Sequence, residues 1–152
     1  MLHSYTRIYV HLIWSTKNRG RLLTKNVRPQ IQQHLLQYAR QKLISIDCLN
    51  VQIEHVHVLI NLMSDQKVDD VVKLLKGESS HWINAENLIQ PEFSWQRGYG
   101  AFSISSSHVE PVRRYIMNQE EHHRDKTFRE ELGTILWKYG YPSLETDESV
   151  RE

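Results

Sequence analysis

The sequence predicts an α+β fold of the ferredoxin-like, or split β-α-β, type, with elements in the order βαββαβ followed by two more helices. Two periodicities support this prediction. Polar and apolar residues alternate over 6–14 and 55–62, which is the pattern of strands with one buried face. Apolar residues instead recur every three to four positions over 27–43 and 68–82, which is the pattern of helices with one buried face.

The predicted elements of the sheet and its two helices are a strand over 6–14, a helix over 27–43, strands over 44–53 and 55–62, a helix over 68–82 and a short strand over 101–104. The first strand should bury Ile8, Val10, Leu12 and Trp14, and the first helix Ile31, Leu35, Tyr38 and Leu43. Because almost nothing separates 44–53 from 55–62, these strands should pair, and 55–62 should lie centrally, beside the first strand.

The two C-terminal helices are predicted from capping signals. Residues 107–110 spell S-x-x-E, a helix-start pattern, and Pro111 is compatible with a first turn, so a third helix should run from there to about His123. Residues 127–130 repeat the pattern as T-x-x-E and should open a fourth helix, which Gly140 and Pro142 would end.

The composition indicates one globular domain over 1–152 in the cytoplasm. No stretch approaches the roughly 20 apolar residues of a membrane span, and the N-terminal residues do not resemble a signal peptide. Cys48, the single cysteine, is expected in the core and excludes an internal disulfide. A net charge of +1 excludes a uniformly basic nucleic-acid coat, so any nucleic-acid surface must be local.

His55 and His57 are the first candidate functional residues. On a strand, their spacing places both imidazoles on one face, close enough to share a metal ion, while Val56 points into the core. Such a pair by itself is weak evidence for a metal site, because two histidines with this spacing are more often ordinary surface residues.

Tyr115 and Gln119 are the second candidate pair. Spaced i, i+4, they should share one face of the third helix. A tyrosine hydroxyl can attack a phosphodiester, and a glutamine oxygen can complete a site for a hard cation. The alternative is a half-buried tyrosine beside a solvated glutamine.

Four stretches, 10–15, 55–60, 95–103 and 115–123, together resemble the single-tyrosine HUH transposases of IS200-like insertion sequences. The resemblance spans nearly the whole chain in the family's order. It implies a divalent metal, Mg²⁺ by default with Mn²⁺ possible, held by His55, His57 and Gln119. It also implies that Tyr115 is the nucleophile, which cleaves single-stranded DNA and forms a 5′-phosphotyrosine.

The resemblance further implies DNA hairpins at the element ends as substrates. It implies a homodimer as well, whose tyrosine helix can complete the partner's active site instead of its own. The sequence departs from the family at the position before the histidine pair, which is often aspartate and is Glu54 here. By strand alternation the Glu54 side chain should point away from the two histidines.

Local cationic residues are candidate DNA contacts. They are Lys17 and Arg19 after the first strand, Lys73 and Lys76 on the second helix, and Arg113 and Arg114 beside Tyr115. Trp95 and Tyr99 flank Gly98 and could stack on bases, although aromatic residues near a turn more often belong to the core.

Three other functions compete with transposition of the protein's own element. The first is a resident relative that acts on repeated extragenic palindromes. The second is a noncatalytic module that binds single-stranded nucleic acid, as RNA-recognition domains of the same element order do. The third is a metal-dependent hydrolase that uses water. Histidines at 55 and 57 suit a metal and are poor stacking platforms, which disfavours the noncatalytic module.

Overall fold

The computed structural model describes residues 1–142. These residues form two compact units, one over 1–117 and one that begins at Asn118. The strands are β1 (Tyr9–Ser15), β2 (Ser45–Val51), β3 (His55–Asn61) and β4 (Gly100–Ile104). The α-helices are α1 (Arg28–Gln41), α2 (Val68–Ala85), α3 (Val109–Met117), α4 (Gln119–Asp125) and α5 (Phe128–Lys138). Two short 3-10 helices are η1 (Lys17–Arg19) and η2 (Ser106–His108).

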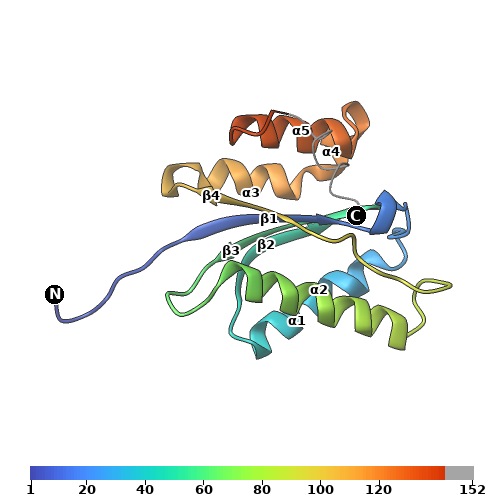
Figure 1. Ribbon diagram of the computed structural model, residues 1–152, viewed down its shortest axis with the longest axis horizontal. Helices are drawn as coiled ribbons and strands as arrows, with labels where there is room; N and C mark the ends of the chain where they lie inside the picture. Colours follow the sequence, from blue (N-terminus) through green and yellow to red (C-terminus); the bar gives the residue numbers. More distant parts are fainter. Residues whose placement is uncertain (143–152) are drawn as a thin grey trace. The chain divides into compact units, whose positions relative to one another are not determined.

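The first unit has the predicted ferredoxin-like sheet. Its strand order is β2-β3-β1-β4, and each neighbouring pair is antiparallel. The central position of β3 beside β1 is confirmed. Helices α1 and α2 cover one face of the sheet and α3 lies on the other (Figure 1).

The face under α1 and α2 holds the main core. Val10, Leu12 and Trp14 of β1 meet Val56 and Val58 of β3 there. The helices contribute the buried residues Ile31, Leu35 and Ala39 of α1 and Val71, Val72, Leu75 and Ile83 of α2. Alternation along the strands, together with helical spacing, therefore places the core as predicted.

Two residues expected in this core lie outside it. Ile8 precedes β1 and is 44% exposed, while Leu43 follows the end of α1 and is 79% exposed. Leu43 has φ of 57°, a left-handed conformation typical of residues just after a helix. The periodicity therefore extended the first strand and the first helix beyond the residues at which β1 begins and α1 ends.

A smaller apolar cluster joins α3 to the opposite face of the sheet. Leu59 of β3 contacts Val109 and Ile116 of α3, and Cys48 is partly buried at its edge. Within the first unit this packing fixes α3 against β3, and it thereby sets the position of Tyr115.

The predicted third helix is divided. Asn118, with φ −100° and ψ 26°, separates α3 from α4, so three α-helices rather than two follow β4 within residues 1–142. Ser107 lies inside η2 and its hydroxyl contacts Ser105 and His108, so it does not cap α3 as expected. Pro111 occupies the first turn of α3, as predicted.

In the second unit, helix α5 begins and ends at the predicted capping residues. The Thr127 hydroxyl accepts a hydrogen bond from the Glu130 amide at 3.2 Å. At the other end Gly140 has φ of 89°, and the Tyr141 amide donates to the Leu136 carbonyl at 2.9 Å. Both are standard terminations of an α-helix. Within residues 1–142 we find no helix long and apolar enough to cross a membrane.

Candidate active site

His55 and His57 lie on the α3 side of β3, opposite the main core. Both are fully buried, and their ring centroids are 4.9 Å apart with planes at 82°. The strand alternation that directs Val56 and Val58 into the core directs the two imidazoles to this face. The juxtaposition predicted from the H-x-H spacing is therefore present.

His11 of β1 is the hydrogen-bond partner of His57. Its Nε2 lies 2.8 Å from His57 Nδ1, and the two rings stack with centroids 5.0 Å apart. The sequence offered no partner for His11, because the contact depends on the register that pairs His11 with Leu59 and Ile13 with His57. The placement of His11 on the noncore face of β1 was the only available signal.

Glu54 is the partner of His55, and the expectation that its side chain points away is wrong. Glu54 Oε1 lies 2.6 Å from His55 Nδ1, while Oε2 lies 3.4 Å from Arg21. Alternation fails here because β3 begins at His55, so Glu54 belongs to the turn before the strand. Its carboxylate is free of the strand geometry that would direct it to the other face.

These contacts determine which nitrogen each histidine offers. Because Nδ1 faces Glu54 in His55 and His11 in His57, Nε2 is the atom with which each ring would bind a metal. Two neighbouring imidazoles, each oriented through its other nitrogen, form a donor set that fits a divalent metal ion.

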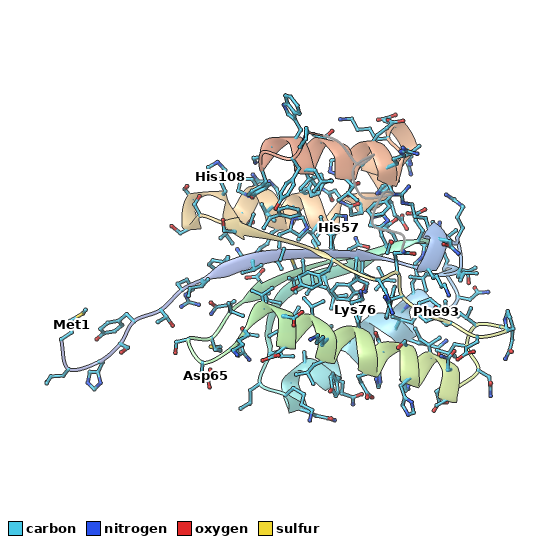
Figure 2. All side chains as sticks on the ribbon, viewed as in Figure 1. Met1, His57, Asp65, Lys76, Phe93 and His108 are labelled. Carbon is cyan, nitrogen blue, oxygen red and sulfur yellow. The ribbon has the colours of Figure 1, made fainter. Side chains whose placement is uncertain are left out.

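Tyr115 of α3 lies beside this histidine pair. Its ring meets His57 edge to face, with centroids 5.8 Å apart and planes at 89°, and it lies 6.5 Å from the His11 ring. Figure 2 shows His57 between the sheet and α3. The nucleophile candidate and both histidines therefore come together within the first unit of one chain.

A second set of contacts ties α3 to β2. The Asn50 amide donates to the Ile116 carbonyl at 2.9 Å, and Gln52 donates to Asn50 Oδ1 at 2.8 Å. Arg113 forms a bidentate salt bridge with Asp47, with both N···O distances at 2.6 Å, and a second salt bridge with Glu110 at 2.7 Å. Hydrogen bonding from Arg113 lowers the pKa of Asp47 below its ordinary value.

Gln119 is the first residue of α4 in the second unit. Within that unit its Oε1 lies 2.9 Å from His123 Nε2, which also lies 2.8 Å from Glu131 Oε2. Because Asn118 separates α3 from α4, Tyr115 and Gln119 belong to different helices, and the expectation that one continuous helix carries both is wrong. The sequence did not identify His123 or Glu131 as site residues, although the i, i+4 spacing of Gln119 and His123 is compatible with their contact.

The cationic candidates are in different environments. Lys17 and Arg19 are exposed on η1, just after the end of β1 where Ser15 pairs with His55. Asn18 and Arg19 have φ of 56° and 52°, and the Asn18 amide donates to Gln96 Oε1 at 2.8 Å. Arg114 is exposed on α3, whereas Arg113 makes the ion pairs described above.

Lys73 and Lys76 belong to α2, on the opposite side of the sheet from His57 (Figure 2). Lys73 pairs with Asp69 at 2.8 Å. The Lys76 ammonium donates to the carbonyls of Gln96 and Gly98 at 2.8 and 2.7 Å, and burial lowers its pKa. Lys76 therefore anchors the segment before β4.

The two aromatic candidates, Trp95 and Tyr99, differ in burial. Trp95 is buried, donates its indole N–H to Ser79 at 2.9 Å and packs edge to face on Trp14 and Phe93. Tyr99 is 39% exposed, and its hydroxyl lies 3.4 Å from Asp69. Trp95 belongs to the core, while Tyr99 is at the surface.

The sheet, the buried histidine pair and the neighbouring tyrosine together define a candidate nucleic-acid-processing enzyme. Residues 4–119 match the family model of IS200-like transposases, so the chain belongs to this family and is a transposase. It is 27% identical over 116 residues to the ISDra2 transposase TnpA of Deinococcus radiodurans, covering 73% of this chain and 83% of that protein.

Two solved structures resemble this protein. A transposase crystal structure from Deinococcus radiodurans R1 matches with a TM-score of 0.63 at 28% identity, covering 78% of this chain and 95% of that one. A REP-associated tyrosine transposase bound to a REP hairpin matches with a TM-score of 0.55 at 18% identity, covering 80% and 73% of the two chains. The second likeness supports the fold.

Proposed function

We propose that this transposase cleaves and rejoins single-stranded DNA through Tyr115. The observation that supports the proposal best is the contact of Tyr115 with His57 inside one chain, 5.8 Å between ring centroids. The sheet face that carries His55 and His57 is also covered by α3. An RNA-recognition module would instead leave aromatic side chains open on that face.

In the proposed reaction the Tyr115 oxygen attacks the scissile phosphorus and loses its proton. The bond from phosphorus to the 3′-oxygen breaks, the 3′-oxygen takes up a proton as a hydroxyl, and the 5′-phosphate stays on Tyr115. Another 3′-hydroxyl then attacks this phosphotyrosine and releases the tyrosine. Each step exchanges one phosphodiester for another, so no nucleotide hydrolysis is needed.

The proposed metal ligands are Nε2 of His55, Nε2 of His57 and the side-chain oxygen of Gln119. The engaged Nδ1 atoms support the two histidines as ligands. Gln119 is assigned by resemblance, and its contact with His123 would orient the amide. When bound, a divalent ion such as Mg²⁺ or Mn²⁺ would polarise the scissile phosphate.

The proposed substrate is a single-stranded DNA hairpin. Lys17 and Arg19 are exposed near the end of the sheet that carries His55, and Arg114 is exposed beside Tyr115, so these three are the proposed phosphate contacts. Lys73, Lys76 and Arg113 instead bind carboxylates or carbonyls of the protein itself, so we do not include them among the proposed phosphate contacts.

The reaction class is tested by incubating the protein with Mg²⁺ and labelled single-stranded hairpins, followed by a denaturing gel. We expect a protein-linked DNA band that requires metal and is lost in Tyr115→Phe. The control Tyr38→Phe, on α1 at the opposite face, should retain it. Cleavage without an adduct, unchanged in Tyr115→Phe, would favour a water-using nuclease, and binding without cleavage would favour the noncatalytic module.

A homodimer is also proposed, in which each Tyr115 acts beside the histidines of its own chain. The His57–Tyr115 contact supports this arrangement. Mixing Tyr115→Phe with His57→Ala tests it, because only exchange of the tyrosine helix between subunits would rebuild an intact site. We expect no adduct from the mixture, whereas recovered activity would show that the tyrosine serves the partner.

A further inference from the structure

We propose that His11 and Glu54 are positioning residues that fix the ring tautomers of His57 and His55, so that Nε2 of each ring is the metal-binding atom. The inference deepens the proposed function and rests on it. Both partners are buried, with 5% and 8% of their surface exposed, and both contacts are short, at 2.8 and 2.6 Å.

The contact between His11 and His57 can carry one proton in either of two ways. If His57 Nδ1 holds it and donates to His11, His57 Nε2 keeps its lone pair for a metal. If His11 Nε2 holds it instead, a neutral His57 must carry its own proton on Nε2, and that nitrogen cannot bind a metal. His11 must therefore act as the acceptor.

The backbone holds His11 in place for this role. It lies in the middle of β1, between the partner strands β3 and β4, and pairs with Leu59 on one side and Phe102 on the other. Its ring also stacks on His57 at an interplanar angle of 27°. The position of the acceptor is therefore fixed by the central part of the sheet.

Glu54 selects the tautomer of His55 more directly. A carboxylate only accepts hydrogen bonds, so His55 Nδ1 must carry the proton and Nε2 the lone pair. Thr16 fixes the turn that carries Glu54, since its amide donates to the Glu54 carbonyl at 2.9 Å and its hydroxyl lies 3.3 Å from the same oxygen. Arg21 contacts the second carboxylate oxygen at 3.4 Å.

Metal binding without DNA tests the proposal independently of cleavage. Mn²⁺ affinity of the full-length protein is measured by calorimetry for the wild type, His11→Phe, His11→Gln and Glu54→Gln. Loss of an orienting partner typically weakens metal binding by about 10- to 100-fold. We expect that loss in His11→Phe, and a smaller loss in His11→Gln and Glu54→Gln, whose amide oxygens can still accept a hydrogen bond.

Two matched controls come from the His34–Glu78 pair, a histidine and a carboxylate 3.2 Å apart on α1 and α2. His34→Gln and Glu78→Gln change the same side-chain types and should leave Mn²⁺ affinity unchanged. Circular dichroism and thermal unfolding identify any variant that fails to fold, and the more conservative His11→Gln and Glu54→Gln then provide the comparison.

Nitrogen NMR of the metal-free protein provides a second readout. We expect His55 and His57 of the wild type to carry their protons on Nδ1, and His57 to lose this preference in His11→Phe. Unchanged tautomers and Mn²⁺ affinity in folded variants would overturn the positioning role while leaving the metal site intact. Absence of Mn²⁺ binding by the wild type would overturn the metal site and the positioning role together.

Discussion

Asn50 of β2 and Ile116 of α3 are joined by a hydrogen bond of 2.9 Å from the side-chain amide to the backbone carbonyl. The carbonyl belongs to the residue next to Tyr115, so the bond links the strand to the turn of α3 that carries the proposed nucleophile. Gln52 donates to the Asn50 oxygen at 2.8 Å and holds the amide in this orientation. The edge strand of the sheet therefore supports the position of Tyr115.

Asn50→Ala should loosen this connection. Loss of one such hydrogen bond costs roughly 1 kcal/mol in the free energy of unfolding, measurable by urea denaturation. Because the lost contact adjoins Tyr115, the rate of adduct formation should also fall. Gln66→Ala, which removes an amide hydrogen bond to the Leu43 carbonyl far from α3, should leave that rate unchanged. Equal rates in both variants would contradict the role of Asn50.

The contact between Asp47 and Arg113 should make the protein's stability depend on pH in the acidic range. Arg113 lowers the pKa of Asp47 below its ordinary value of 3.8, so the folded state favours the charged carboxylate. The resulting stabilisation is present above pH 3.8 and is lost as the pH falls through the lowered pKa. Urea denaturation should show Asp47→Asn less stable than the wild type at pH 7, and the difference in the free energy of unfolding should shrink as the pH falls below 3.8. A constant difference would contradict the prediction.

The sheet was predictable because its signals are local. Alternation with a period of two identified β1 and β3 and placed His55 and His57 on one face, opposite Val56. The relations of His11 and Glu54 to these histidines were not predictable in the same way. The contact of His11 with His57 depends on the register between β1 and β3, and the contact of Glu54 with His55 depends on the residue at which β3 begins.

The break at Asn118 is a second feature that periodicity missed. The i, i+4 spacing of Tyr115 and Gln119 assumed one continuous helix, and no proline or glycine marks an interruption between them. The burial of Trp95 was not predictable from periodicity either. Trp95 packs on Trp14 in the core, although the nearby Gly98 and Tyr99 are at the surface. Such outcomes depend on tertiary packing, which local propensity does not contain.

The salt dependence of hairpin binding should distinguish Lys17 from Lys76. Each phosphate contact on single-stranded DNA contributes about 0.7 to the slope of log affinity against log salt concentration. Lys17→Ala should reduce the slope by about that amount. Lys76→Met should leave the slope unchanged and lower the thermal unfolding temperature, because its ammonium binds the carbonyls of Gln96 and Gly98. A reduced slope in Lys76→Met would instead identify a DNA contact.

Cys48 should be poorly reactive in the folded protein. Burial, with the nearby Asp47 charge, raises the pKa of its thiol to about 11 from an ordinary value of 9.0. Only the thiolate reacts with disulfide reagents, and its fraction at pH 8 falls from about a tenth to about a thousandth. Labelling by a chromogenic disulfide should therefore be roughly 100-fold slower in the folded protein than in urea.

The same thiol can report on the charges that hold α3 to β2. Asp47→Asn removes the negative charge that raises the Cys48 pKa and leaves the positive charge of Arg113, which lowers it. Labelling of folded Asp47→Asn should therefore be faster than that of the wild type, provided that the thiol stays half-buried. Arg113→Gln leaves Asp47 without its partner and should slow the reaction further. If both variants react at the wild-type rate, burial alone controls the thiol and these charges do not influence it.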